Sequence, residues 1–400
     1  MANLEFRAPG ILGRVAINEL LLPMSLDVRK YKFIDALRGY AILGVILVHS
    51  TQSVTPVSGV LKWIAESGAK GVQLFFIASA LTLSMSWHSR NSQEMSPIRN
   101  FYLRRFFRVA PMFYVAIVFY LFLNGFAASY WAPNGIQWWF VPLTALFLNG
   151  FHPESITSIV PGGWSIAVEM NFYLILPFLM LHLKKTKSLV LFLVFSLSIY
   201  AVSKYALLHL LLTRYPQEQQ YLVSDFAVLS VFGQMPVFAI GLIAFSAYSK
   251  TANLRRIVAW GWLGFTSFIL LAMMSPLHAK ILGNYITFSA GFALFALTLA
   301  IYPVKVLVNS VVVHFGKLSF SMYLAHFAVL AFLAAIGLTP DFPPGDLSSM
   351  AFFLLVTAAS AAISFITYSV VERNGVKLGA RIIDRLDAPR RTSASVELTG

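Results

Sequence analysis

The stretch "FIDALRGYAILGVILVHS" is almost entirely apolar, yet it holds an arginine, Arg38, and a histidine, His49. Eleven residues of α-helix turn through about 1100° and rise about 16 Å, so the two side chains share one helix face. An ionisable side chain within a membrane is a functional candidate by default. His49 is therefore predicted to handle a proton, and Arg38 to bind or stabilise negative charge. Two plainer roles stay open: a snorkelling anchor for Arg38, and a structural, hydrogen-bonded histidine for His49.

A second polar cluster, "RNFYLRRFFRVAPMFY", places four arginines at the start of an apolar segment. Arg105 and Arg108 lie one helical turn apart, and Arg104 neighbours Arg108 in the same way. Planar guanidinium groups bind phosphates through paired hydrogen bonds, so Arg104, Arg105 and Arg108 are predicted to bind a phosphorylated ligand. The alternative is a positive anchor or a contact with anionic lipid headgroups.

A third stretch, "GGWSIAVEMNFYLILP", carries one carboxylate, Glu169. It lies about five residues into its helix, roughly 8 Å below the outer end. That depth resembles the depth of His49, so we expect the two side chains to meet. A carboxylate on one imidazole nitrogen fixes the tautomer and raises the basicity, as a general base requires. Otherwise Glu169 only complements the positive end of its helix.

Three further polar residues are candidates for binding a substrate. Ser165 and Tyr173 lie four residues on either side of Glu169 and share its stripe, where they bind a polar substrate or satisfy the carboxylate. His326, in "GKLSFSMYLAHFAVL", is expected to line the same cavity, with a core histidine bonded to a hydroxyl as the alternative. No side chains show metal-ligand spacing, so no metal is predicted.

The elements that position these residues must lie in a membrane. Of the 400 residues, 58% are hydrophobic and 12% are charged, and the mean hydropathy is +0.73. The chain has no cysteine, which excludes disulfides and thiolate chemistry. Most of the 30 Lys and Arg fall at the ends of apolar segments, so the net charge of +14 reports membrane topology and not a nucleic-acid partner.

Several segments are long and apolar enough to span a bilayer. They are residues 34–53, 69–87, 106–126, 164–183, 188–212, 226–248, 257–275, 283–302, 318–337 and 349–371. An eleventh candidate, residues 136–151, is short and interrupted by Pro142. Counting it as a span would place most later basic clusters outside, so the positive-inside rule favours ten spans with both termini in the cytoplasm.

The predicted fold is an all-α bundle of ten transmembrane helices. We divide the chain into a cytoplasmic N-terminal arm, residues 1–33, a transmembrane domain, residues 34–372, and a cytoplasmic tail, residues 373–400. The tail is expected to begin as a basic amphipathic helix on the membrane surface and to become disordered over its last nine residues. Residues 127–163 are expected to form a partly re-entrant outer loop whose "QWWF" piece dips into the membrane interface.

Five motifs, in this order, resemble the acyltransferase family 3 of multi-pass membrane proteins, which includes O-acetyltransferases of bacterial surface glycans. The motifs are "IDALRGYAILGVILVHS", "GVQLFFIASA", "RRFFRVAP", "GWSIAVEMNFYLILP" and "GKLSFSMYLAHF". The match covers roughly residues 33–372 and implies ten helices with a cytoplasmic N-terminus. It also implies that Arg38 and His49 are needed for transfer, and that Arg105 and Arg108 bind the acyl-CoA donor.

The activity implied by the resemblance is transfer of an acyl group, most simply acetyl, from acetyl-CoA to a hydroxyl. The acceptor would be a glycan, a lipid-linked sugar or another small polyol, and the enzyme would sit in a bacterial inner membrane. His49 would act as general base or carry the acyl group, Arg38 would guide the thioester or stabilise developing charge, and Glu169 would orient His49. Gln73 and Met170 stand where relatives often carry acids, so roles of those acids are not carried over.

Two other functions are compatible with the sequence. A proton-coupled secondary transporter would use His49 and Glu169 as a relay and would move substrate into sealed vesicles without consuming CoA. A scaffold or sensor with the same fold would tolerate changes at Arg38 and His49 together.

Overall fold

The computed structural model describes residues 31–251, 284–339 and 342–397, and this part of the chain is helical, without a named strand. Eight of its helical segments are long and apolar enough to cross a membrane. The principal helices are α2 (Lys32–Ser53), α3 (Gly59–Ser67), α4 (Gly71–Arg90), α5 (Pro97–Asn124), α6 (Phe140–Ala145), α7 (Gly163–His182), α8 (Thr186–Leu211), α9 (Gln220–Leu229), α10 (Val231–Thr251), α12 (Asn284–Ile301), α13 (Ser310–Ala335), α14 (Asp346–Thr367) and α15 (Arg373–Glu397).

The helices match the expected spans wherever the two can be compared. Nine expected segments fall on described helices, although the apolar helix within α12, Tyr285–Ile301, is shorter than the other eight. The expected span at residues 257–275 lies outside the described residues, so the total of ten and the side of each terminus stay predictions. The exclusion of residues 136–151 is confirmed, because α6 has only six residues.

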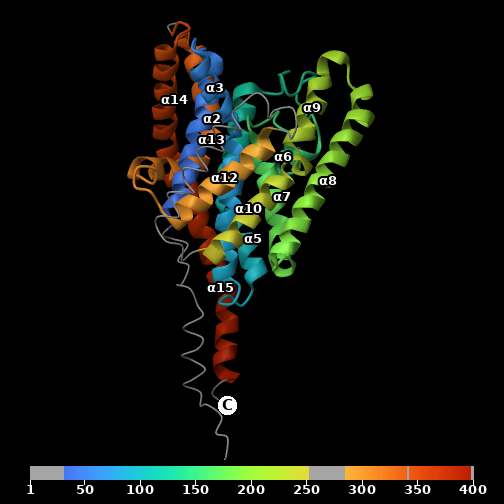
Figure 1. The fold of residues 1–400 in the computed structure, drawn as a ribbon, viewed down its shortest axis with the longest axis vertical. Helices are drawn as coiled ribbons and strands as arrows, with labels where there is room; N and C mark the ends of the chain where they lie inside the picture. Colours follow the sequence, from blue (N-terminus) through green and yellow to red (C-terminus); the bar gives the residue numbers. More distant parts are fainter. Residues whose placement is uncertain (1–30, 252–283, 340–341, 398–400) are drawn as a thin grey trace, which may run out of the picture.

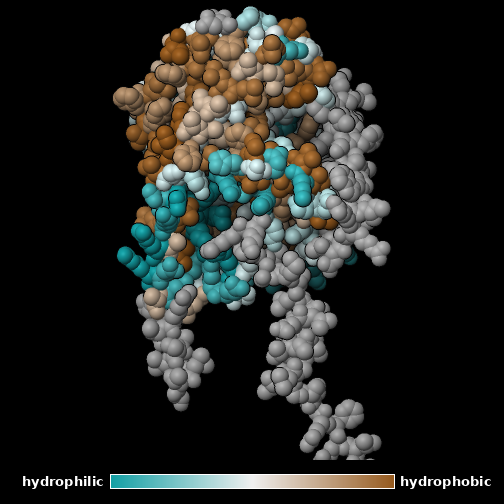
Figure 2. Space-filling view, turned by 90° about the vertical axis from the view of Figure 1, so that its left-hand side faces the viewer, coloured by the Kyte–Doolittle hydropathy of each residue, from teal (hydrophilic) through white to brown (hydrophobic). Residues whose placement is uncertain are grey.

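The surface agrees with a protein that crosses a bilayer. Figure 2 shows one face whose upper part is covered by apolar residues and whose lower part is hydrophilic. Helix α8 is an extreme case, since only 11% of its most apolar window is buried. A long apolar helix with so little protein contact fits a lipid environment.

The centre of the bundle is built on a close pairing of α2 with α13. Figure 1 shows these two helices together with α14 on one side of the molecule, and α8 on the opposite side. Glycines bring the two backbones together: a Cβ on Gly316 would lie 1.7 Å from the carbonyl oxygen of Asp35, and one on Gly39 would lie 2.1 Å from that of Val312. Small residues allow such close approach of membrane helices. The pairing fixes which neighbours Arg38 and His49 meet.

Gly316→Ala is therefore expected to destabilise the protein by forcing α2 and α13 apart. Overpacking of this kind costs roughly 1–3 kcal/mol, and the obstacle here is backbone, which cannot rotate away. The measurement is the thermal unfolding midpoint in detergent. Gly59→Ala is the matched control, because a Cβ at Gly59 meets nothing within 4 Å and should leave the midpoint unchanged or raise it. Equal midpoints for the two variants would contradict the proposed role of this contact.

The C-terminal segment differs from the expectation. The expected helix at the start of the tail is present, but it is longer than expected: α14 continues through a π-helical turn, Tyr368–Glu372, directly into α15, which is helical to Glu397. Its position on the membrane surface stays a prediction. Figure 1 shows α15 leaving the lower end of the bundle. Its first turns pack on α5, where a Cβ on Gly375 would lie 2.7 Å from the carbonyl oxygen of Phe107. No proline separates α14 from α15, so the helix is not interrupted there.

The connection between α5 and α7 folds over the bundle instead of extending from it. Residues 155–160 are all buried, and the Asn149 side-chain amide donates a hydrogen bond to the carbonyl of Ile156 at 2.9 Å. Trp139 packs against the core, whereas Trp138 is 76% exposed. Whether this segment enters the membrane interface stays a prediction.

Candidate functional site

Five helices enclose a cavity of about 110 Å³ inside the bundle. This volume is large enough for several water molecules, and it is therefore also large enough for a small acyl group. Helix α2 contributes Arg38, and α5 contributes Arg105 and Arg108. The remaining polar lining comes from α4 (Ser79, Thr82), α7 (Ser165, Glu169, Tyr173) and α13 (Ser319, Tyr323). Six of the nine predicted site residues therefore line one cavity, and the other three, His49, Arg104 and His326, do not.

The arginines that line the cavity differ in how far their charge is neutralised. Arg108 Nη1 lies 2.6 Å from Glu372 Oε1 in an ion pair, and Glu372 is almost fully buried. Arg38 donates a hydrogen bond to Thr82 Oγ1 at 3.5 Å. Arg105 stacks its guanidinium 5.8 Å from the Phe101 ring centre, and its buried Nε has no hydrogen-bond partner among the described residues. Arg38 and Arg105 form no ion pair within that part of the chain, so they are the free positive charges of the cavity.

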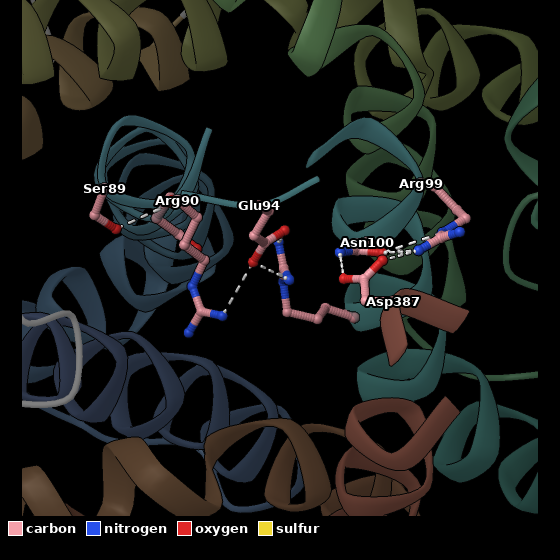
Figure 3. Close-up of polar contacts among 8 residues, drawn as sticks. Ser89, Arg90, Glu94, Arg99, Asn100 and Asp387 are labelled. Carbon is pink, nitrogen blue, oxygen red and sulfur yellow. Dashed lines mark hydrogen bonds and ion pairs between the residues drawn. The ribbon is translucent and has the colours of Figure 1, made fainter. Parts of the chain in front are cut away.

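Arg104 is not placed where the sequence suggested. Its guanidinium donates two hydrogen bonds to Glu94, at 2.6 and 3.1 Å, and it does not line the cavity. Figure 3 shows Glu94 between α4 and α5, with Arg90 also directed at it. The assignment of Arg104 to a phosphorylated ligand is corrected accordingly: successive helix positions point about 100° apart, so Arg104 and Arg105 face different neighbours.

Arg99 and Asn100 make a second contact at the same end of the bundle. Both donate hydrogen bonds to the carboxylate of Asp387 on α15, and Figure 3 shows the three side chains converging. Asn100 is completely buried and Asp387 almost so. This contact ties α15 to α5 and leaves Arg105 and Arg108 as the α5 arginines that face the cavity.

Helix α7 is positioned by a residue that has to be glycine. Gly162 precedes the helix with φ +74°, and a Cβ there would lie 2.7 Å from the Tyr323 hydroxyl oxygen. The Tyr323 hydroxyl donates to the Gly162 carbonyl at 3.0 Å, and the Ser165 hydroxyl donates to the Tyr323 oxygen at 2.9 Å. One turn further on, Glu169 accepts a hydrogen bond from Ser79 on α4 and faces the Tyr173 hydroxyl.

His49 has different neighbours from those expected. Its Nδ1 lies 3.1 Å from Gln52 Oε1, and its ring packs on the rings of Phe327 and His326, with centroids 4.5 and 5.5 Å away. The expected pairing of His49 with Glu169 is therefore wrong: Glu169 bonds to Ser79 instead. Spacing along each helix suggested a similar depth for the two residues, but α2 turns His49 toward α13, while α7 turns Glu169 toward α4.

The hydrogen bond to Gln52 has a chemical consequence. An amide oxygen only accepts, so His49 donates from Nδ1, and Nε2 carries the lone pair that a general base uses. Gln52 thus takes the orienting role that the sequence assigned to Glu169. Its position, three residues after His49 and one turn along the helix, is the signal that could have identified it.

His326 lies between His49 and the cavity. It is fully buried, its Nδ1 lies 3.2 Å from the Met322 carbonyl oxygen, and its Nε2 has no hydrogen-bond partner among the described residues. Its ring centroid is 5.8 Å from that of Tyr323, which does line the cavity. The cavity therefore stops at Tyr323, and two rings, those of Tyr323 and His326, separate it from His49.

Glu372 is a site residue that the sequence did not reveal. It ends the π-helical turn between α14 and α15 and holds both Arg108 and the Ser321 hydroxyl, the latter at 3.0 Å. Turns of π-helix occur frequently at functional sites. In the sequence Glu372 is one of several charged residues at the end of an apolar segment, and nothing in its spacing indicates the partner on α5.

The fold and the site together define a polytopic helical membrane protein with an internal cavity lined by arginines. The chain belongs to the acyltransferase family whose sequence model, described as an acyltransferase domain, matches residues 31–369. The resemblance noted from the five motifs is thus confirmed.

Two relatives show the extent of the likeness. The peptidoglycan O-acetyltransferase OatA of Listeria monocytogenes is 30% identical over 180 residues, which cover 40% of this chain and 26% of that protein. The O-acetyltransferase OatA of Staphylococcus aureus is 23% identical over 365 residues, 83% of this chain and 55% of that protein. The chain therefore spans about half the length, or less, of these relatives. No solved structure matches the chain.

Proposed function

We propose that this chain is a membrane O-acyltransferase that moves an acyl group, most simply acetyl, from acyl-CoA to a hydroxyl of a glycan or lipid-linked sugar. The observation that carries the proposal is the cavity that Arg38 and Arg105, two arginines without an ion pair among the described residues, line together with Glu169 and Ser165. Family membership supports the reaction class, and the names of the two relatives support a glycan acceptor. A bacterial inner membrane is the location that fits such a reaction.

The donor would bind from the side of the arginine cluster. A cavity of about 110 Å³ holds an acyl group and not a whole CoA, so the phosphates must lie toward its arginine-lined end. Arg105 and Arg108 would bind those phosphates through paired hydrogen bonds. Binding through Arg108 requires competition with Glu372, whereas Arg105 has no anion to release among the described residues.

The transfer step would use His49 as the base. The acceptor O–H gives its proton to His49 Nε2 while the oxygen attacks the thioester carbonyl carbon, and Arg38, about 16 Å away along α2, would guide the donor into the cavity. The C–O bond forms, the C–S bond breaks, and the thiolate leaves with the proton returned from the imidazolium. Because Tyr323 and His326 separate His49 from the cavity, this step requires their rings to shift when donor and acceptor are bound.

The test is incubation of the purified protein with labelled acetyl-CoA and cell-wall glycans, following free thiol and labelled glycan together. Equal amounts of thiol and acylated glycan are expected. Substrate uptake into sealed vesicles without thiol release would instead favour a proton-coupled transporter. A transporter would need a proton relay between His49 and Glu169, but these two residues bond to different partners.

A further inference from the structure

A second, larger pocket lies beyond the outer end of α2, on the far side of His49 from the arginine cavity. Its volume is about 450 Å³, and it is open to the surface. Ser53, which lines it, follows His49 by four residues, which is one turn or about 6 Å along the same helix. The connection between α13 and α14 supplies the opposite wall through Thr339, Phe342, Pro343 and Pro344.

The described lining combines hydroxyl groups with an aromatic ring. Ser53, Thr55 and Thr339 supply three hydroxyls, and Phe342 supplies the ring. The Thr339 hydroxyl is buried yet has no hydrogen-bond partner within the described part of the chain. A buried polar atom without a partner destabilises the fold, so it indicates a ligand or water that satisfies it. Phe342 is held by Phe352, with ring centroids 5.2 Å apart.

The pocket is rigid at the side where α2 ends. The Gly345 N–H donates to the Thr55 carbonyl at 3.1 Å, and the Ser349 hydroxyl donates to the Val54 carbonyl at 2.8 Å. Asp346 Oδ1 accepts two backbone N–H groups from the segment after α2, both at 2.9 Å. These bonds fix the end of α2 to the start of α14, so this side of the pocket is formed before a ligand binds. Preformed sites with few polar groups are typical of small-molecule recognition.

We propose that this pocket binds a sugar unit of the acceptor, with its hydroxyls on Thr339, Thr55 and Ser53 and an apolar face of the ring on Phe342. The inference rests on the proposed function, because it makes the pocket the acceptor side of the transfer reaction. The three hydroxyls disfavour an acyl chain as the ligand. His49 then lies between donor and acceptor, with the cavity on one side and the pocket on the other.

The test uses the absence of cysteine from the chain. Thr339→Cys introduces a single thiol in the pocket, and its rate of labelling by a hydrophilic maleimide is measured in lipid nanodiscs with and without N,N′,N″-triacetylchitotriose. The sugar should slow labelling at least threefold and saturably. Leu347→Cys is the matched control, because Leu347 lies at the start of α14, is 84% exposed and does not line the pocket. Equal rates with and without the sugar, or equal slowing at both positions, would overturn the proposal.

A second variant separates this inference from the proposed function. Phe342→Ala should raise the KM for the glycan at least tenfold, measured from initial rates of labelled glycan formation at saturating acetyl-CoA. An unchanged glycan KM would count against the pocket while the transferase stands. Failure of the unaltered protein to release thiol from acetyl-CoA would instead overturn the proposed function, and the labelling experiment would still decide whether the pocket binds sugar.

Discussion

Replacing His49 by alanine is expected to reduce acyl transfer by roughly 10²–10⁴-fold, the usual contribution of a positioned general base. The imidazole lies one helical turn from Ser53 of the second pocket and packs on His326, whose ring contacts Tyr323 of the cavity, and Gln52 Oε1 lies 3.1 Å from its Nδ1. The KM for acetyl-CoA should change little, because the side chain does not touch the donor cavity. The measurement is the initial rate of labelled glycan formation at saturating donor.

The control for this variant is His182→Ala. His182 is exposed near the end of α7, and its ring contacts only the Phe178 carbonyl of its own helix, at 2.8 Å. Its removal should leave the rate and the unfolding midpoint unchanged. The role of His49 would be contradicted by a rate within a few-fold of the unaltered protein. If His326→Ala abolished transfer and His49→Ala did not, His326 would be the base instead.

Apolar periodicity and charge placement predicted the fold well because they report burial and membrane crossing directly. Lys and Arg at the ends of segments excluded residues 136–151 as a span, and the structure has only the short helix α6 there. The π-helical turn before Arg373 was not predictable, because the sequence shows only that an apolar segment ends and basic residues begin. Continuation of a helix beyond the membrane depends on packing against α5, which is a tertiary contact.

The site was predictable residue by residue but not as a set of contacts. Spacing along one helix correctly grouped Ser165, Glu169 and Tyr173, because one helix fixes their relative directions. Spacing cannot give the rotation of one helix relative to another. That rotation decides that Glu169 faces Ser79 and that His49 faces His326.

The same limit applies to the arginines of α5. Their number indicated an anion site, but which charges remain free depends on acids elsewhere in the chain. Glu94 neutralises Arg104, and Asp387 and Glu372 pair with Arg99 and Arg108. Two of these three acids are more than 250 residues away in sequence from their partners. Only the fold shows that Arg105 is the α5 arginine left without an ion pair among the described residues.

Arg105→Ala is therefore expected to raise the KM for acetyl-CoA by about 10- to 100-fold. A hydrogen bond to a charged group is worth about 1.5–3 kcal/mol, and each 1.4 kcal/mol corresponds to a factor of ten. The KM for the glycan should stay the same, because Arg105 lines the cavity between the five helices and not the pocket at the end of α2. The KM of Arg105→Lys for acetyl-CoA should lie between those of the unaltered protein and Arg105→Ala, since lysine keeps the charge and loses the planar paired donors.

Arg104→Gln is the matched comparison for this prediction, because Arg104 is the next residue on the same helix and its charge is already held by Glu94. It should change the donor KM less than threefold. Both KM values are obtained from initial rates of thiol release, with the second substrate saturating. Equal increases in the donor KM for the two variants would show that the arginines act only through their positive charge. A rise in the glycan KM alone for Arg105→Ala would place the phosphate-binding groups elsewhere. Two adjacent charges would act on the donor through nearly the same long-range field. A larger rise in the donor KM for Arg105→Ala than for Arg104→Gln therefore requires a direct contact between Arg105 and the donor.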